Sequence, residues 1–277
     1  MDIIKIGDCP YFICPYFIRI IFMLLAFSVG GCSSNSGIAE DPSIEKIFSG
    51  RGMTGTMVIA SLEGRTKYVH NSWRANQRFS PASTFKILNT LIALEEGVVA
   101  DEKETIKWDG ITRNISDWNQ DMTLEGAFKY SCVPVFQGFA EKIGADRYQI
   151  FLDDTNYGNR QAGTNATTFW LDGTLTVSAT EQIDFLRNIV RQRLPFKERN
   201  FDILRKVMVN EVGDGYTIYA KTGWFNHDDV QYGWFVGYVE SHGNIWLFAM
   251  NIDTQSAEDL KFRKMLTIEA LKAKGII

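Results

Sequence analysis

The chain has 277 residues, of which 45% are hydrophobic and 22% charged, and its formal net charge is −4 at pH 7. This length is enough for one sizeable core or for two closely interleaved lobes. The composition is ordinary for a soluble globular enzyme. A weak negative charge without any block of Lys or Arg argues against a nucleic-acid partner.

The N-terminal segment has the composition of an export signal. Arg19 precedes an apolar run over residues 20–29, and small residues follow it. The run is too short to cross a bilayer as a stable helix, but its length suits the core of a signal peptide. We therefore expect residues 1–31 to be a signal peptide and 32–45 to be a polar tether. A folded domain is expected over 46–277.

The sequence around Cys32 leaves two interpretations open. Residues 29–32 are similar to a bacterial lipobox, in which the cysteine is lipidated and becomes the first mature residue; the alternative is a plain secretory cleavage nearby. Both predict a periplasmic protein, and the first adds a lipid anchor, which Ser33 directs to the outer membrane. Cys9 and Cys14 leave with the leader, so only Cys32 and Cys132 remain. Because a lipidated Cys32 cannot pair, no structural disulfide is expected.

Apolar periodicity predicts strands at both ends of the chain and helices between them. The expected strands cover residues 56–62, 66–70, 216–221, 232–240 and 245–252. The segment from about 101 to 200 is mostly helical in pattern, with Thr180 as a candidate cap, and a last helix is expected over 257–274. We therefore expect an α+β domain whose terminal antiparallel sheet carries helices on its faces. A mainly helical lobe is inserted, and the cleft between the two is the expected site.

The segment from Ser80 to Gly97 predicts a helix that is buried inside the domain. Pro81 suits its start and Gly97 its end, and the residues between them are apolar nearly all round. Ser83 and Lys86 stand near its start at a spacing that puts both side chains on one face. Apolar surroundings lower the pKa of a lysine, and a neutral amine beside a hydroxyl activates that hydroxyl as a nucleophile.

Taken alone, this pair is equally consistent with a capping serine and a snorkelling lysine. Further stretches accompany it, however. Ser131 lies between two expected helices, and residues 221–223, Lys-Thr-Gly, end an expected strand, where glycine permits close backbone approach. Residues 157–159 (Tyr-Gly-Asn) and 169–171 (Phe-Trp-Leu) lie between them in the chain.

The motifs Ser-x-x-Lys, Ser-x-Val, Tyr-Gly-Asn, Phe-Trp-Leu and Lys-Thr-Gly, in this order, resemble those of the class D serine β-lactamases. The resemblance extends over essentially the whole mature chain, including residues 232–238. Ser-x-x-Lys and Lys-Thr-Gly also mark class A β-lactamases and penicillin-binding proteins. Ser-x-Val and Tyr-Gly-Asn favour class D. Cys132, in the middle of Ser-x-Val, departs from the commonest patterns and is expected to be buried and inert.

The resemblance implies the chemistry of four residues. Ser83 would attack the β-lactam of penicillins and related antibiotics and form an acyl-enzyme. Lys86 would carry an N-carboxylate, made from carbon dioxide, as general base for acylation and deacylation. Ser131 would relay protons to the leaving nitrogen, or be an ordinary interhelical hydroxyl. Trp170 would donate its indole N–H to the carboxylated lysine, a role compatible with that of a core aromatic.

The resemblance also implies how the substrate is held. Lys221 and Thr222 of the Lys-Thr-Gly motif, which Gly223 completes, would bind the substrate carboxylate with help from Arg263. For Arg263 the alternative is a surface helix residue.

Four residues would shape the rest of the site. The backbone N–H groups of Ser83 and Trp224 would form the oxyanion hole. Val133 and Leu171 would limit the entry of water to the carboxylated lysine, or simply pack in the core. Residues 157–159 are expected to be scaffold rather than chemistry.

Other classes of enzyme lack support in the sequence. There is no Gly-x-Ser-x-Gly, no His-Glu-x-x-His and no cluster of Cys and His, so neither a Ser-His-Asp hydrolase nor a metal site is expected. No cofactor is expected beyond carbon dioxide or bicarbonate. The rival functions share the site: a transpeptidase, or a β-lactam sensor domain, which acylates without efficient turnover. Substrate range and oligomeric state stay open.

Overall fold

The structure is a computed structural model that describes residues 39–227 and 229–277. The expected signal peptide, the lipidation predicted at Cys32 and tether residues 32–38 lie outside these residues. In the described part of the chain, no helix is both long enough and apolar enough to cross a membrane.

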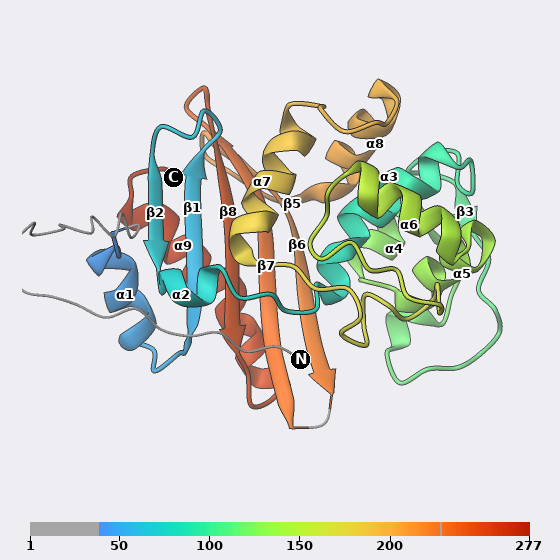
Figure 1. Ribbon diagram of the computed structural model, residues 1–277, viewed down its shortest axis with the longest axis horizontal. Coiled ribbons are helices and arrows are strands. Elements are labelled where there is room, and N and C mark those ends of the chain that lie inside the picture. The colour runs from blue at the N-terminus through green and yellow to red at the C-terminus, as the bar shows by residue number, and fades with distance from the viewer. Residues whose placement is uncertain (1–38, 228) are drawn as a thin grey trace, which may run out of the picture. The chain divides into compact units, whose positions relative to one another are not determined.

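A six-stranded antiparallel sheet forms the centre of the domain, in the order β2–β1–β8–β7–β6–β5 (Figure 1). Its strands are β1 (Gly55–Ser61), β2 (Lys67–His70), β5 (Val209–Gly213), β6 (Tyr216–His227), β7 (Val230–Ser241) and β8 (Asn244–Asp253). A separate pair consists of β3 (Thr105–Ile106) and β4 (Met122–Thr123). Strand β1 pairs with β8, so the first and last strands of the domain lie side by side. The expected terminal antiparallel sheet is therefore confirmed.

Helices cover both faces of the sheet, and others form a separate layer beside it (Figure 1). Helices α1 (Pro42–Ser49) and α9 (Lys261–Ala273) pack on one face, and α2 (Ser72–Ala75) and α7 (Ala179–Val190) on the other. The inserted helical part contains the 3₁₀ helix η1 (Ala82–Phe85), α3 (Lys86–Glu95), η2 (Ser116–Trp118), α4 (Leu124–Lys129), α5 (Val133–Ile143), α6 (Ala145–Asp154) and α8 (Glu198–Met208); η3 (Ala257–Leu260) precedes α9. The expected α+β class is confirmed.

The central strands read as continuous apolar runs because both of their faces are buried. In β1, Met57 and Ile59 pack in the core under α1 and α9, whereas Val58 and Ala60 pack in the core under α7. Successive side chains of a strand point to opposite faces. A sheet covered on both sides therefore needs apolar residues at consecutive positions.

The folded domain begins before residue 46, so the expected tether is too long at its C-terminal end. Helix α1 starts at Pro42, and the Asp41 carboxylate caps it and pairs with Lys274. The Glu40 carboxylate accepts two backbone N–H groups just after β2. These contacts tie the last tether residues to the sheet and to α9.

Two expected element positions are also wrong. Lys221 and Gly223 lie in the middle of β6, because the hairpin with β7 continues to His227 opposite Val230. The apolar pattern stops earlier because the hairpin tip is exposed. Helix α7 is capped by Ser178 rather than Thr180: Ser178 Oγ accepts the Glu181 N–H at 3.1 Å, and the Glu181 carboxylate accepts the Ser178 N–H at 2.8 Å.

Candidate active site

Ser83 and Lys86 meet where η1 passes into α3. Ser83 is half-buried and Lys86 is fully buried, and Lys86 Nζ lies 2.9 Å from Ser83 Oγ. The Lys86 ammonium also lies over the ring of Phe136 from α5, 5.2 Å from its centroid. The expected buried helix is confirmed over α3, where every residue except Glu95 is buried. Its first turn differs from the expectation, because residues 82–85, which include Ser83, form the 3₁₀ helix η1.

Burial lowers the pKa of Lys86 from 10.5 to about 7, and a smaller electrostatic interaction with the Cys132 thiol acts in the opposite direction. The cause is lost hydration of the ammonium, which apolar neighbours do not replace. A substantial fraction of Lys86 is therefore a neutral amine near pH 7. Cys132 is itself buried, and burial raises the pKa of its thiol, as expected for an inert cysteine.

A second serine–lysine pair joins the helical part to the sheet. Ser131, in the turn between α4 and α5, has a φ of 57°, a left-handed conformation uncommon outside glycine. Its Oγ accepts a hydrogen bond of 3.0 Å from Lys221 Nζ on β6. The pKa of Lys221 is well below its usual value because of burial first and then repulsion from Lys86 and Arg263. The pKa of Lys221 thus depends on the charge of Lys86.

Glycines let β6 approach η1 closely and let β7 approach α9 closely. A Cβ on Gly223 would lie 2.9 Å from the carbonyl oxygen of Pro81, and one on Gly233 would lie 2.6 Å from Arg263 Cδ. Arg263 Nη1 donates to the Gly223 carbonyl oxygen at 2.7 Å. Burial lowers the pKa of Arg263 to about 10, so the guanidinium keeps its charge at neutral pH. Arg263 is therefore held against the Lys-Thr-Gly motif rather than free on the surface.

Trp170 is fully buried, and its ring stacks on Phe85, the residue before Lys86, with centroids 5.6 Å apart. Its indole Nε1 is buried and has no hydrogen-bond partner within the described residues. Buried polar groups are rarely left unpaired, and each such group needs an explanation. The orphaned N–H is therefore suited to an acceptor that is not part of the unmodified chain.

The other predicted substrate-contacting residues are less constrained. Val133 is the first residue of α5, Leu171 packs against the core beneath the helical part, and both are half-buried. Thr222 and Trp224 are half-buried on β6 on either side of Gly223, and the carbonyl oxygen of Thr222 accepts a bond of 3.2 Å from the Lys221 ammonium.

The Tyr-Gly-Asn motif braces the loop that follows Trp170. Asn159 Nδ2 donates to the Thr174 carbonyl oxygen at 2.8 Å, and its Oδ1 accepts the Thr176 N–H at 3.1 Å. Gly158 has a φ of 56°, and a Cβ there would lie 2.1 Å from the Thr176 carbonyl oxygen. The motif thus acts as the expected scaffold.

Three positioning contacts were not expected from the sequence. The rings of Phe136 and Phe128 lie against the Lys86 and Lys221 ammonium groups, and Ser80 bonds to Trp170. The only sequence signal for Ser80 is its position just before Pro81. Ring contacts between α5, α4 and the lysines depend on tertiary packing and have no sequence signal.

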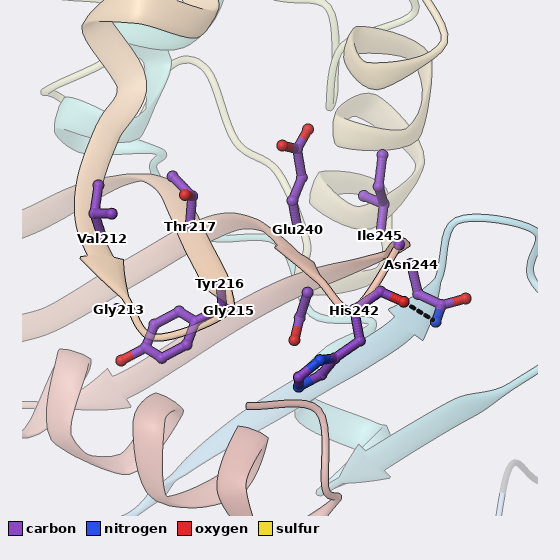
Figure 2. A pocket seen from close by; sticks show the side chains of 11 residues that line it. Val212, Gly213, Gly215, Tyr216, Thr217, Glu240, His242, Asn244 and Ile245 are labelled. Carbon is purple, nitrogen blue, oxygen red and sulfur yellow. Dashed lines mark hydrogen bonds between the residues drawn. The ribbon is translucent and has the colours of Figure 1, made fainter.

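Two cavities lie apart from this cluster. One, of about 570 Å³, lies between the β5–β6 and β7–β8 turns, where Figure 2 shows Tyr216, Glu240 and His242 around it. The other, of about 430 Å³, lies against α5 and is reached by Cys132 and Trp118. Neither is lined by Ser83 or Lys86. Within residues 39–227 and 229–277, His, Cys, Asp and Glu side chains form no group of three that could hold a metal ion.

Comparison with known proteins shows the family to which the chain belongs. Residues 54–272 match the family described as the penicillin-binding protein transpeptidase domain. The chain therefore belongs to this family.

Closer relatives define the branch. β-Lactamase OXA-48 of Klebsiella pneumoniae is 41% identical over 263 residues, which cover 94% of this chain and 99% of that protein. Two solved class D β-lactamases share the fold. YbXI from Nostoc has a TM-score of 0.82 and 39% identity, covering 84% of this chain and 98% of that one. FUS-1 from Fusobacterium nucleatum subsp. polymorphum has a TM-score of 0.83 and 36% identity, covering 86% of this chain and 100% of that one. The chain belongs to the class D β-lactamases, as its motifs predicted.

The backbone contact at Gly158 predicts a difference between two glycines with the same conformational demand. Gly158 and Gly173 both have positive φ, but a Cβ on Gly173 would meet nothing within 4 Å. We expect Gly173→Ala to lower the free energy of unfolding by about 1 kcal/mol, the cost of positive φ alone. Gly158→Ala should cost at least about 2 kcal/mol more, because the Thr176 carbonyl must move. Urea unfolding measures both, and equal losses would contradict the bracing role of the motif.

Proposed function

We propose that this protein hydrolyses the β-lactam amide of penicillins and related antibiotics through an acyl-enzyme on Ser83. The observation that carries the proposal is the 2.9 Å contact between Ser83 Oγ and the buried Lys86 Nζ. A nucleophilic hydroxyl beside a base of matched pKa is the arrangement that acyl transfer requires. The relatives support the choice of substrate, because OXA-48 and OXA-10 are named as β-lactamases.

We propose further that Lys86 works as an N-carboxylate. Its neutral amine attacks carbon dioxide, forming the N–C bond and releasing one proton. Carboxylation of Lys86 would supply a general base for both acylation and deacylation. Two observations support the fit: the pKa of Lys86 is about 7, and the Trp170 Nε1–H is buried without a partner. The groups that lower the pKa of neighbouring Lys221 include Lys86 and Arg263, both positive, so an anion at Lys86 would relieve repulsion.

The remaining residues divide the work of binding and proton transfer. Ser131, whose hydroxyl accepts a hydrogen bond from Lys221 Nζ, passes a proton to the departing β-lactam nitrogen. Lys221, Thr222 and Arg263 bind the substrate carboxylate.

Two further pairs complete the site. The backbone N–H groups of Ser83 and Trp224 stabilise the developing oxyanion. Val133 and Leu171 keep bulk water from Lys86.

Intact-protein mass of the domain mixed with excess benzylpenicillin, with substrate loss followed in the same tube, tests this function. Rapid loss with a transient adduct on Ser83 is expected, and Ser83→Ala should abolish both. A stable one-to-one adduct without turnover would instead indicate a transpeptidase or sensor domain, which the match to the transpeptidase family keeps as the second candidate. Neither adduct nor turnover would overturn serine acylation.

Carboxylation predicts how activity depends on pH and on bicarbonate. Because the pKa of Lys86 is about 7, its amine becomes an ammonium as the pH falls below that value and no longer reacts with carbon dioxide. We expect kcat/KM to fall between about pH 8 and about pH 6. At pH 7.5, degassing should lower it and added bicarbonate should restore it. Sodium chloride at equal ionic strength is the control, and kinetics indifferent to degassing would exclude the carboxylated lysine.

The carboxylate-binding role of Arg263 predicts a substrate-dependent effect. Arg263→Ala should lower kcat/KM for a penicillin by about tenfold or more, the value of a charge-assisted hydrogen bond. The variant also loses the bond to Gly223, which affects all substrates alike. The methyl ester of the same penicillin is therefore the control. Its kcat/KM should fall much less, and an equal fall for acid and ester would place the carboxylate elsewhere.

We also propose that the protein is exported to the periplasm and anchored to the outer membrane through lipidated Cys32. The support is the sequence of the leader alone. Cell fractionation of Cys32→Ala against the unmodified chain separates the alternatives. Loss of the membrane-bound fraction is expected, whereas a soluble periplasmic protein in both cases would indicate plain secretory cleavage.

A further inference from the structure

The loop that carries Trp170 is fastened at both ends to two consecutive residues, Phe79 and Ser80. At its far end, Phe79 and Val177 exchange two backbone hydrogen bonds, of 3.0 and 2.8 Å. At its near end, Ser80 Oγ donates to the Trp170 carbonyl oxygen at 2.8 Å. Residues 79–80 lead directly into η1, so the same short segment holds the Trp170 loop and the nucleophile.

Strand β7 fixes the backbone of Ser80. Its N–H donates to the Tyr232 hydroxyl at 2.8 Å, and its carbonyl oxygen accepts the Trp234 Nε1–H at 2.9 Å. Ser80 is 2% exposed, and all of its polar groups have partners. Because the main chain is held by the sheet, the hydroxyl is the single group of Ser80 that reaches the Trp170 loop.

The same hydroxyl also accepts a hydrogen bond from the backbone next to the nucleophile. Ser80 Oγ accepts the Ala82 N–H at 3.4 Å, the local turn that serine side chains commonly form. Ala82 directly precedes Ser83 and has a φ of 46°, a conformation that costs free energy for any residue with a Cβ. A hydroxyl has one donor and two acceptor lone pairs, so both bonds can form at once.

We propose that Ser80 is a positioning residue that orients the Trp170 indole toward Lys86 while it holds the backbone before Ser83. The inference rests on the proposed carboxylation of Lys86. The Nε1–H of Trp170 is buried and has no partner among the described residues, and the proposed carboxylate on Lys86 is the acceptor that we assign to it. Where this N–H lies depends on the position of the Trp170 backbone. The ring stack on Phe85 limits its tilt, and the Ser80 bond fixes its main chain. Without that bond, the carbonyl of Trp170 is left buried and unpaired, and the loop shifts to satisfy it.

The test measures kcat/KM against bicarbonate concentration for the wild-type protein, Ser80→Ala and Ser80→Cys. For Ser80→Ala we expect the half-maximal bicarbonate concentration to rise about tenfold, the equivalent of one lost hydrogen bond to the group. Saturating bicarbonate should restore activity to within a few-fold of wild type. Ser80→Cys keeps a similar side-chain volume and a weak hydrogen-bond donor. Its half-maximal bicarbonate concentration should therefore lie between those of the wild-type protein and Ser80→Ala.

Thr155→Val is the matched control. Thr155 is also buried, and its hydroxyl donates to the Phe151 carbonyl oxygen at 2.6 Å at the end of α6. The control should lose stability but keep the wild-type bicarbonate midpoint. An unchanged midpoint in Ser80→Ala would overturn the proposal. So would a loss of activity that bicarbonate does not rescue, because that is the result of a purely structural role.

A second readout separates this proposal from the proposed function. In 5-fluorotryptophan-labelled protein, the ¹⁹F resonance of Trp170, assigned by Trp170→Phe among the seven tryptophans, reports the indole environment directly. It should shift in Ser80→Ala and not in Thr155→Val. If wild type itself ignores bicarbonate, carboxylation fails, and the resonance still decides the positioning role. A resonance that does not move would refute it.

Discussion

Removal of Lys86 from water is the constraint on which the site depends. The shift of its pKa from 10.5 to about 7 corresponds to ~5 kcal/mol against the ammonium form. The ammonium form is unfavourable because α3 is buried on every side, with the Phe136 ring against the amine. The neutral amine that results is the form that the proposed reaction with carbon dioxide requires. A more exposed lysine at the same position would be a permanent cation and would not supply that form.

Three basic groups converge from elements distant in sequence: Lys86 from α3, Lys221 from β6 and Arg263 from α9. Burial and mutual repulsion lower the pKa of Lys221, and burial lowers that of Arg263. An anion that enters this site stabilises the charged forms of these groups, which burial and repulsion otherwise disfavour. The proposed carboxylated lysine and the substrate carboxylate are both anions, so Lys221 and Arg263 would favour the formation of one and the binding of the other.

The remaining polar contacts hold backbone rather than perform chemistry. Asn159 and Gly158 brace the loop after Trp170, and Ser80 joins the start of this loop to η1 and to β7. The absence of a side chain at Gly223 lets β6 lie against η1, and its absence at Gly233 lets β7 lie against Arg263. The site is thus held by strands and by loops that are hydrogen-bonded to their neighbours, which suits a precisely defined geometry.

The sequence by itself determined the α+β class, the buried helix, the order of the motifs and the Ser83–Lys86 pair, because these follow from local periodicity and short spacings. It misplaced the cap of α7, the end of β6 and the start of the domain. Side-chain capping by Ser178 and Asp41 and the pairing of β6 with β7 set these ends, and apolar periodicity does not report either. The contact of Ser131 with Lys221, the hold of Arg263 on Gly223, the rings against the two lysines and the role of Ser80 were decided by the tertiary structure. Each joins residues far apart in the chain, and no local pattern encodes such a distance.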